Sequence, residues 1–213
     1  MKFRSLIKKI PYAKSVYRKL IRGSISKTVL DKGKIPLLLK DLYLYAKGNN
    51  DLEQKLRLYS FVAKCCWDNP SVPYVNKELE EDLLLISKKV INFDLDKFDG
   101  KNTTLHVMTI ARPYGGHTRV VDNWIKVLNK FKHSVILNTS ISNSVPKFLI
   151  DAVHNSGGHI IYNDKRDMIE KAQYLAKVAS KYKNVVLHHH SYDILPLVAF
   201  GNSIFSRPIF FYN

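Results

Sequence analysis

The sequence has few cysteines and no long apolar run. Its only cysteines, Cys65 and Cys66, are adjacent, and adjacent residues rarely form a disulfide because the bond needs α-carbons on separate, facing positions. A reducing compartment is therefore expected. No stretch approaches the roughly eighteen uninterrupted apolar residues of a membrane-spanning helix, and the N-terminus lacks the apolar segment of a secretory signal. These absences predict a cytoplasmic protein, with peripheral attachment to the inner face of a membrane left open.

Two nucleotide-binding motifs are also missing. There is no G-x-G-x-x-G sequence, and the segment expected as the second strand ends in NTSIS rather than in an acidic residue that could bind a ribose. A dehydrogenase is therefore disfavoured. The absence of a Walker A sequence excludes a P-loop nucleotide hydrolase.

Acidic residues are scarce at the start of the chain. The formal net charge is +16, and nine Lys and Arg residues precede the first acidic residue, Asp31. Between residues 2 and 22, apolar side chains recur every three or four positions among these basic ones, which predicts an amphipathic helix bent at Pro11. Two interpretations stay open with equal weight: adhesion to anionic lipid headgroups, or a helix docked on the protein with its basic side solvated.

The first hundred residues are expected to be helical. Periodicity predicts helices over residues 35–47, 51–67 and 76–90, and Asn50 followed by Glu53 looks like the capped start of the second of these. The segment that follows, NFDLDKFDGKN, has the composition of a linker. We therefore expect residues 1–100 to form a basic helical N-terminal extension with a linker.

Residues 101–213 show a different pattern, in which short apolar runs alternate with amphipathic segments. Such alternation predicts parallel strands joined by right-handed helical crossovers. The expected fold class is therefore α/β, a Rossmann-like parallel sheet with helices on both faces. The predicted strands are residues 104–111, 133–138, 158–162, 184–189 and 208–212, and the predicted helices are 117–130, 145–153, 164–182 and 194–201.

In an open parallel sheet, ligands bind at the carboxyl ends of the strands, so the loops after the strands are the candidate sites. The first is ARPYGGHTRVV, in which Gly115 and Gly116 would let backbone amides approach an anion at the start of a helix. His117 and Arg119 add hydrogen-bond donors beside them. The alternative is a tight turn that needs glycine only for its dihedral angles.

The second candidate loop is LHHHSYDILPLVAFG. Because alternate residues of a strand share a side, His188 and His190 are expected to point together and His189 away from them. A histidine in a crevice can hydrogen-bond a sugar hydroxyl or a developing charge. Two alternatives are a zinc site that recruits His106 or His159, and simple packing at the strand end. Asp193 is expected to cap the following helix.

Three segments together resemble the N-terminal, acceptor-side domain of GT-B glycosyltransferases, in particular the bacterial enzymes that build surface polysaccharides. They are the first predicted strand with PYGGHTRVVDNW, the LHHHSYDILPLVAFG segment, and RPIFFYN. The resemblance covers about half of the chain. It implies transfer of a sugar from a nucleotide-sugar donor to a glycan or lipid-linked acceptor, with no cofactor and no required metal ion.

The resemblance also implies roles for individual residues. Gly115 and Gly116 would lie near the donor diphosphate, and His190 would lie beside the transferred sugar as the catalytic candidate, with His188 as second choice. The other expected substrate-binding residues are His117, Arg119 and Asp193.

The sequence departs from this family because no second Rossmann domain for the donor follows. We therefore expect a fragment, a truncated product or one subunit of a split enzyme with a separate donor-domain chain, and little transferase activity from this chain alone. Two other classes stay open: a basic α/β protein that binds membranes or nucleic acid without catalysis, and a nucleotide-sugar epimerase-like domain. Nucleic acid ranks lower, because the sequence has no aromatic and basic motif of the RNP kind.

Overall fold

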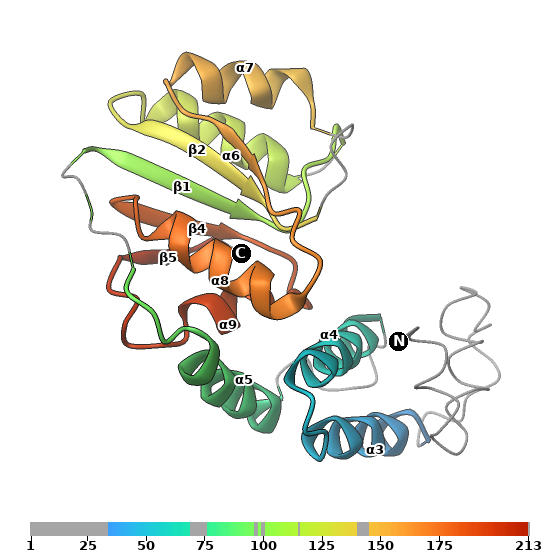
Figure 1. Ribbon diagram of the computed structural model, residues 1–213. Helices are drawn as coiled ribbons and strands as arrows, with labels where there is room; N and C mark the ends of the chain where they lie inside the picture. The colour runs from blue at the N-terminus through green and yellow to red at the C-terminus, as the bar shows by residue number, and fades with distance from the viewer. Residues whose placement is uncertain are drawn as a thin grey trace.

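A computed structural model describes residues 34–68, 76–95, 98, 101–114, 116–139 and 145–212. The amphipathic helix predicted between residues 2 and 22 lies outside this part of the chain, as does Gly115. Within it, a sheet is covered by helices on both faces, and three further helices pack against one of the helical layers (Figure 1).

The predicted α/β fold with a parallel sheet is confirmed. Five strands of the described residues pair in the order β3-β2-β1-β4-β5, and each of these pairings is parallel. The three inner strands, β2, β1 and β4, are almost wholly buried, as expected of strands covered on both faces, whereas the edge strands β3 and β5 are half-buried or exposed. The strands are β1 (Thr103–Met108), β2 (Lys132–Leu137), β3 (Ile160–Tyr162), β4 (Asn184–His188) and β5 (Ile209–Phe211).

Helices cover both faces of the sheet. On one face, α6 (Gly116–Val127) and α7 (Lys147–Asn155) bury Val121, Ile125 and Leu149 against β1 and β2. On the other face lie α8 (Met168–Ala179) and α9 (Leu195–Phe200). The buried side of α8 consists of Ala172, Leu175, Ala176 and Ala179.

The described N-terminal part is helical, as predicted. Its helices are α3 (Lys34–Lys47), α4 (Leu52–Asp68) and α5 (Lys77–Val90). Asn76 caps α5 by accepting a hydrogen bond from the backbone of Leu79. The predicted cap of α4 was wrong by one residue: Asp51, not Asn50, accepts from the backbone N–H of Gln54 at 3.1 Å. An N-cap side chain bonds the second or third helical N–H, and Asp51 is the residue placed to do so.

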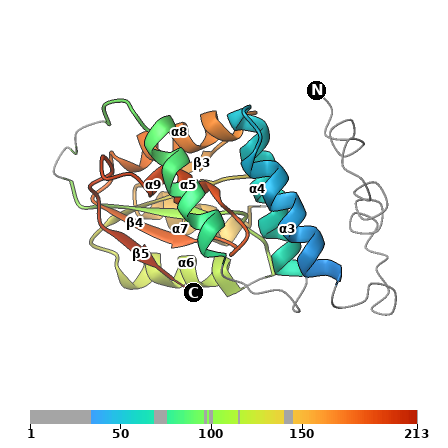
Figure 2. The same cartoon turned by 90° about the horizontal axis from the view of Figure 1, so that it is seen from below.

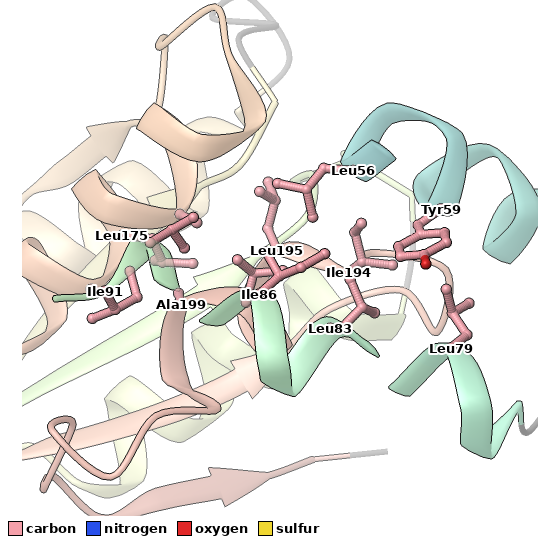
Figure 3. Close-up of a cluster of buried hydrophobic side chains, with 14 of the residues drawn as sticks. Leu56, Tyr59, Leu79, Leu83, Ile86, Ile91, Leu175, Ile194, Leu195 and Ala199 are labelled. Atoms are coloured by element: carbon pink, nitrogen blue, oxygen red, sulfur yellow. The ribbon is translucent and has the colours of Figure 1, made fainter. Parts of the chain in front are cut away.

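The three N-terminal helices share one apolar core with the sheet. This core runs from α3 and α4 through α5 to α8, α9 and the adjacent face of β1 and β4. Figure 3 shows Leu56 and Tyr59 of α4 and Leu83 of α5 directed toward Ile194 and Leu195 at the start of α9. Viewed from below, α5 lies across α9 and α8, with α4 and α3 to one side (Figure 2).

Polar contacts fix the orientation of these helices. The hydroxyl groups of Tyr43 and Tyr59 both donate to the same oxygen of Asp82, at 2.9 and 2.8 Å, and so join α3, α4 and α5. Glu53 of α4 accepts from the backbone N–H of Ile169 at 3.1 Å and thereby caps α8 from outside. Hydrogen bonds as well as apolar burial therefore hold the helical region to the α8 and α9 layer.

The strand order creates a switch point between β1 and β4. The connections from β1 through β2 to β3 run over the α6 and α7 face, whereas those from β3 through β4 to β5 run over the opposite face. The loops after β1 and β4 therefore leave the sheet side by side and in opposite directions. A crevice at this edge is where open α/β sheets bind ligands.

Candidate functional site

Asp193 holds the carboxyl edge of the sheet together. One carboxylate oxygen accepts from the hydroxyl of Thr109 at 2.8 Å and from the side-chain amide of Asn138 at 3.1 Å. The other oxygen accepts from the backbone N–H of Leu195 at 3.1 Å. Asp193 is not the N-cap residue of α9, which is Ile194, but it lies one position before it and accepts from the first helical N–H. The same carboxylate also joins the ends of β1 and β2 to the start of α9. Its predicted contact with a substrate stays a prediction.

His190 lies at the same edge, just beyond β4. Its backbone N–H donates to the hydroxyl of Thr109 at 3.0 Å, which fixes the loop against β1. Its ring stacks on Tyr192 with centroids 5.2 Å apart and an interplanar angle of 6°. The ring of His117, the second residue of α6, lies 5.8 Å away. The glycine loop and the histidine loop singled out in the sequence therefore meet at one edge of the sheet.

The surroundings of His190 favour its neutral form. Partial burial lowers the pKa of His190 below the usual value of 6.5, and the charges of His117 and Arg112 lower it further, while Asp193 opposes them. At neutral pH the ring is therefore an uncharged imidazole. Such a ring can accept a proton or a hydrogen bond from a hydroxyl group.

Gly116, the first residue of α6, faces open space. Its φ is not in the left-handed region, and a β-carbon added there would meet no atom of the described residues within 4 Å. The turn before it closes through a hydrogen bond from the backbone N–H of Arg112 to the hydroxyl of Thr118, at 3.0 Å. Neither the backbone conformation nor the packing of the described chain requires glycine at position 116. The interpretation as a tight turn that needs glycine for its dihedral angles therefore fails for Gly116.

Arg119 does not join this group. Its guanidinium lies over the ring of Phe148 on α7, 3.9 Å from the ring centroid. The arginine whose charge acts on His190 is instead Arg112, in the loop after β1. Sequence reasoning missed Arg112, although its position just past a strand end was a usable signal.

The two other histidines of the HHH run point to opposite faces, as the alternation predicted. His188 is 1% exposed and lies on the α6 face, where Nε2 of its ring is 3.0 Å from Nδ1 of His106. In this conformation a substrate at the rim cannot contact it. His189 packs against Phe211 and lines a cavity of about 420 Å³ on the opposite face, between α4, α5, α9 and the β4–β5 edge.

The helical region reaches the candidate site through α4. The ammonium group of Lys64 lies 4.7 Å from the ring centroid of Tyr192. The ring centroids of Trp67 and Tyr192 lie 6.3 Å apart. Because Tyr192 stacks on His190, α4 supports the loop that carries this histidine. No sequence pattern indicated that these residues would meet, since Lys64 and Tyr192 are far apart along the chain.

The zinc alternative finds no ligand set in the described part of the chain, where no group of three or more His, Cys, Asp or Glu side chains is placed to hold a metal ion. His106 is engaged with other histidines on both ring nitrogens, and His159 is exposed just before β3. Among the described helices, none has the length and apolar character needed to cross a bilayer.

The edge of the sheet thus combines a helix N-terminus facing open space, a neutral histidine and an arginine.

Comparison of the chain with protein-family models, with curated proteins and with solved structures gives no match.

Proposed function

We propose that this chain supplies the acceptor-side half of a glycosyltransferase site that uses a nucleotide-sugar donor. The observation that carries the proposal is the meeting of His190 with His117 beside the open N-terminus of α6, at the switch point of a parallel sheet. The resemblance of the two loops to GT-B enzymes supports the same reading. The acceptor would be a glycan or a lipid-linked sugar.

The start of α6 would bind the donor diphosphate. Unpaired N–H groups and the helix dipole favour an anion at a helix N-terminus, and the space in front of Gly116 would let phosphate oxygens approach the backbone. Arg112, which is exposed and close enough to lower the pKa of His190, would add a positive charge. This set of groups favours a diphosphate over an uncharged ligand.

His190 would act on the sugar or on the acceptor hydroxyl. As the new glycosidic bond forms, that hydroxyl loses its proton, and a neutral imidazole within hydrogen-bonding distance can accept it. The stacking on Tyr192 and the backbone bond to Thr109 hold the ring in place for this contact. His188 would support the site from beneath without touching the substrate, because it is buried.

A binding experiment with two variants tests this assignment. Uridine diphosphate and a panel of uridine-, guanosine- and thymidine-diphosphate sugars are titrated into the chain and followed by saturation-transfer NMR, with and without EDTA. Gly116→Val should fold normally, because its side chain enters open space, and should weaken binding of free nucleotide and nucleotide sugar alike. His190→Ala should weaken only the nucleotide sugar.

The matched control is His154→Ala, an exposed change on α7. It should leave every titration unchanged. If no nucleotide or nucleotide sugar binds to the unmodified chain, or if Gly116→Val binds as well as the unmodified chain, the proposed function is wrong.

We further propose that the basic residues 1–30 bring the site to an anionic membrane surface. The support is the charge pattern of the sequence, which suits anionic headgroups. Vesicles with and without phosphatidylserine measure the attachment, and a chain that begins at residue 31 should lose it. Equal retention of the shortened chain would contradict the proposal, and salt-sensitive binding to duplex DNA in place of vesicles would favour the nucleic-acid alternative.

A further inference from the structure

Three buried histidines form a row across the sheet beneath α6. They are His188 on β4, His106 on β1 and His133 on β2, and each is at most 1% exposed. His188 lies two residues beyond the β4 partner of His106, and His133 lies two residues before its β2 partner. The row therefore runs diagonally over three adjacent strands, with the ring of Trp124 edge-on to His106 and His188.

Every link in the row is a hydrogen bond. Nε2 of His188 is 3.0 Å from Nδ1 of His106, and Nε2 of His106 is 3.0 Å from Nδ1 of His133. Nε2 of His133 is 2.9 Å from the backbone oxygen of Leu128. Because burial lowers the pKa of all three rings, they are neutral at pH 7 and each carries one ring proton.

The carbonyl at one end fixes the position of all three protons. A carbonyl oxygen only accepts, so His133 must carry its proton on Nε2, which leaves its Nδ1 as an acceptor. His106 must then donate from Nε2, and His188 must do the same toward His106. All three rings are therefore Nε2–H tautomers, and the row has a single direction.

The row is left open at His188. Nδ1 of this ring is buried and has no hydrogen-bond partner among the described residues, so its lone pair is free to accept a proton. The ionisable groups near this ring are His117 at the start of α6, whose charge lowers its pKa, and Tyr212 after β5, whose ring centroid lies 5.7 Å from that of His188. His189, the next residue, also lowers this pKa but lies on the opposite face of the sheet. The open end of the row thus lies behind the rim that carries His117 and His190.

The other end of the row, at His133, favours a positive charge. The oxygen of Leu128 lies just past the carboxyl end of α6, where the helix dipole favours cations. The hydrogen bond to the oxygen of Leu128 raises the pKa of His133 and so partly offsets the lowering by burial. The pKa of His106, in contrast, is lowered by burial and further by the charges of His188 and His133. The acidic residue of α6 that is buried, Asp122, is paired with Lys126.

We infer that the row is a proton-binding relay, which accepts one proton from solvent at Nδ1 of His188 and holds it at His133. The Nε2 proton of His188 passes to Nδ1 of His106, and the Nε2 proton of His106 passes to Nδ1 of His133. One proton is taken up in all. His133 becomes an imidazolium, and His188 and His106 become Nδ1–H tautomers. This inference does not depend on the proposed sugar transfer.

Nitrogen NMR on the chain with ¹⁵N-labelled histidine tests the starting state. At pH 7.5 the three rings should show the Nε2–H pattern of chemical shifts, and couplings across two N–H···N hydrogen bonds should link His188 to His106 and His106 to His133. An Nδ1–H tautomer at His188, or missing couplings in the folded protein, would overturn the inference.

Acidification tests the transfer. As the pH is lowered, His133 should become doubly protonated while His188 and His106 change tautomer over the same pH interval. In His106→Phe the row is interrupted, so His133 should titrate while His188 keeps its tautomer. The control His154→Gln should behave as the unmodified chain does. Titration of His133 without a tautomer change at His188 in the unmodified chain would refute the relay, as would unfolding before any ring takes up a proton.

Discussion

The buried histidine row makes the protein sensitive to acid, and His188→Gln tests how strongly. Burial first, and then the charges of His117 and His189, lower the pKa of His188 to about 4 from its usual 6.5. The unfolded chain therefore binds a proton at this position more readily than the folded chain. Stability is fully present above pH 6.5 and is lost as the pH falls toward 4.

The size of the effect follows from these two values. At about 1.4 kcal/mol for each pKa unit, His188 alone should lower the free energy of unfolding by about 2 kcal/mol at pH 5 and by about 3 kcal/mol below pH 4. Glutamine has a side-chain N–H at the position of the histidine Nε2, so it can keep the hydrogen bond to His106. It does not titrate, so this part of the pH dependence should disappear in the variant.

Urea unfolding at pH 7.5 and pH 5.0, followed by circular dichroism, measures the difference. The loss of stability between the two pH values should be about 2 kcal/mol smaller in His188→Gln than in the unmodified chain. Removal of the exposed His154 should leave that loss unchanged. Equal losses in His188→Gln and the unmodified chain would refute the reasoning, because the buried ring would then have no lowered pKa.

Four further substitutions, one of them a control, test the packing by urea unfolding. Gly158→Ala puts a methyl group onto the backbone of β2 and should lower the free energy of unfolding by about 3 kcal/mol. The methyl group of Gly116→Ala meets no described atom within 4 Å and should change it by less than about 0.5 kcal/mol. Similar values for both variants would contradict this difference in packing. Asp193→Ala removes three hydrogen bonds and should cost about 3 kcal/mol, so a loss below about 1 kcal/mol would show that this carboxylate does not hold the sheet edge. Tyr59→Phe should cost about 1 kcal/mol by removing one donor from Asp82, and no loss at all would be the contrary result.

Much of the fold could be predicted because it depends on short-range periodicity. Val121 and Ile125 mark the buried side of α6, and the apolar runs mark the strands. The alternation of side chains along a strand also predicted that His188 and His189 would face opposite ways. The cap of α4 was missed by one residue, because Asn50 and Asp51 are both capping residue types and only the geometry of the first turn separates them.

The side-chain contacts between distant parts of the chain at the site could not be predicted. The contact of Asp193 with Thr109 and Asn138 needs the order and register of the strands, which hydrophobic patterns do not specify. The same holds for the histidine row, which exists only because β4, β1 and β2 are neighbours. The position of Arg119 over the ring of Phe148 could not be predicted either, because it depends on where α7 packs.

The support of Tyr192 by α4 has a practical consequence for any shortened form of this protein. A chain that begins at β1 would keep all strands of the described sheet but would lose Lys64 and Trp67, which contact Tyr192. The loop that carries His190 would thereby lose the support that α4 gives to Tyr192. Loss of function in such a truncation would say nothing about the basic N-terminal residues. A deletion meant to probe only those residues should end before α3, so that the contacts of α4 with Tyr192 remain.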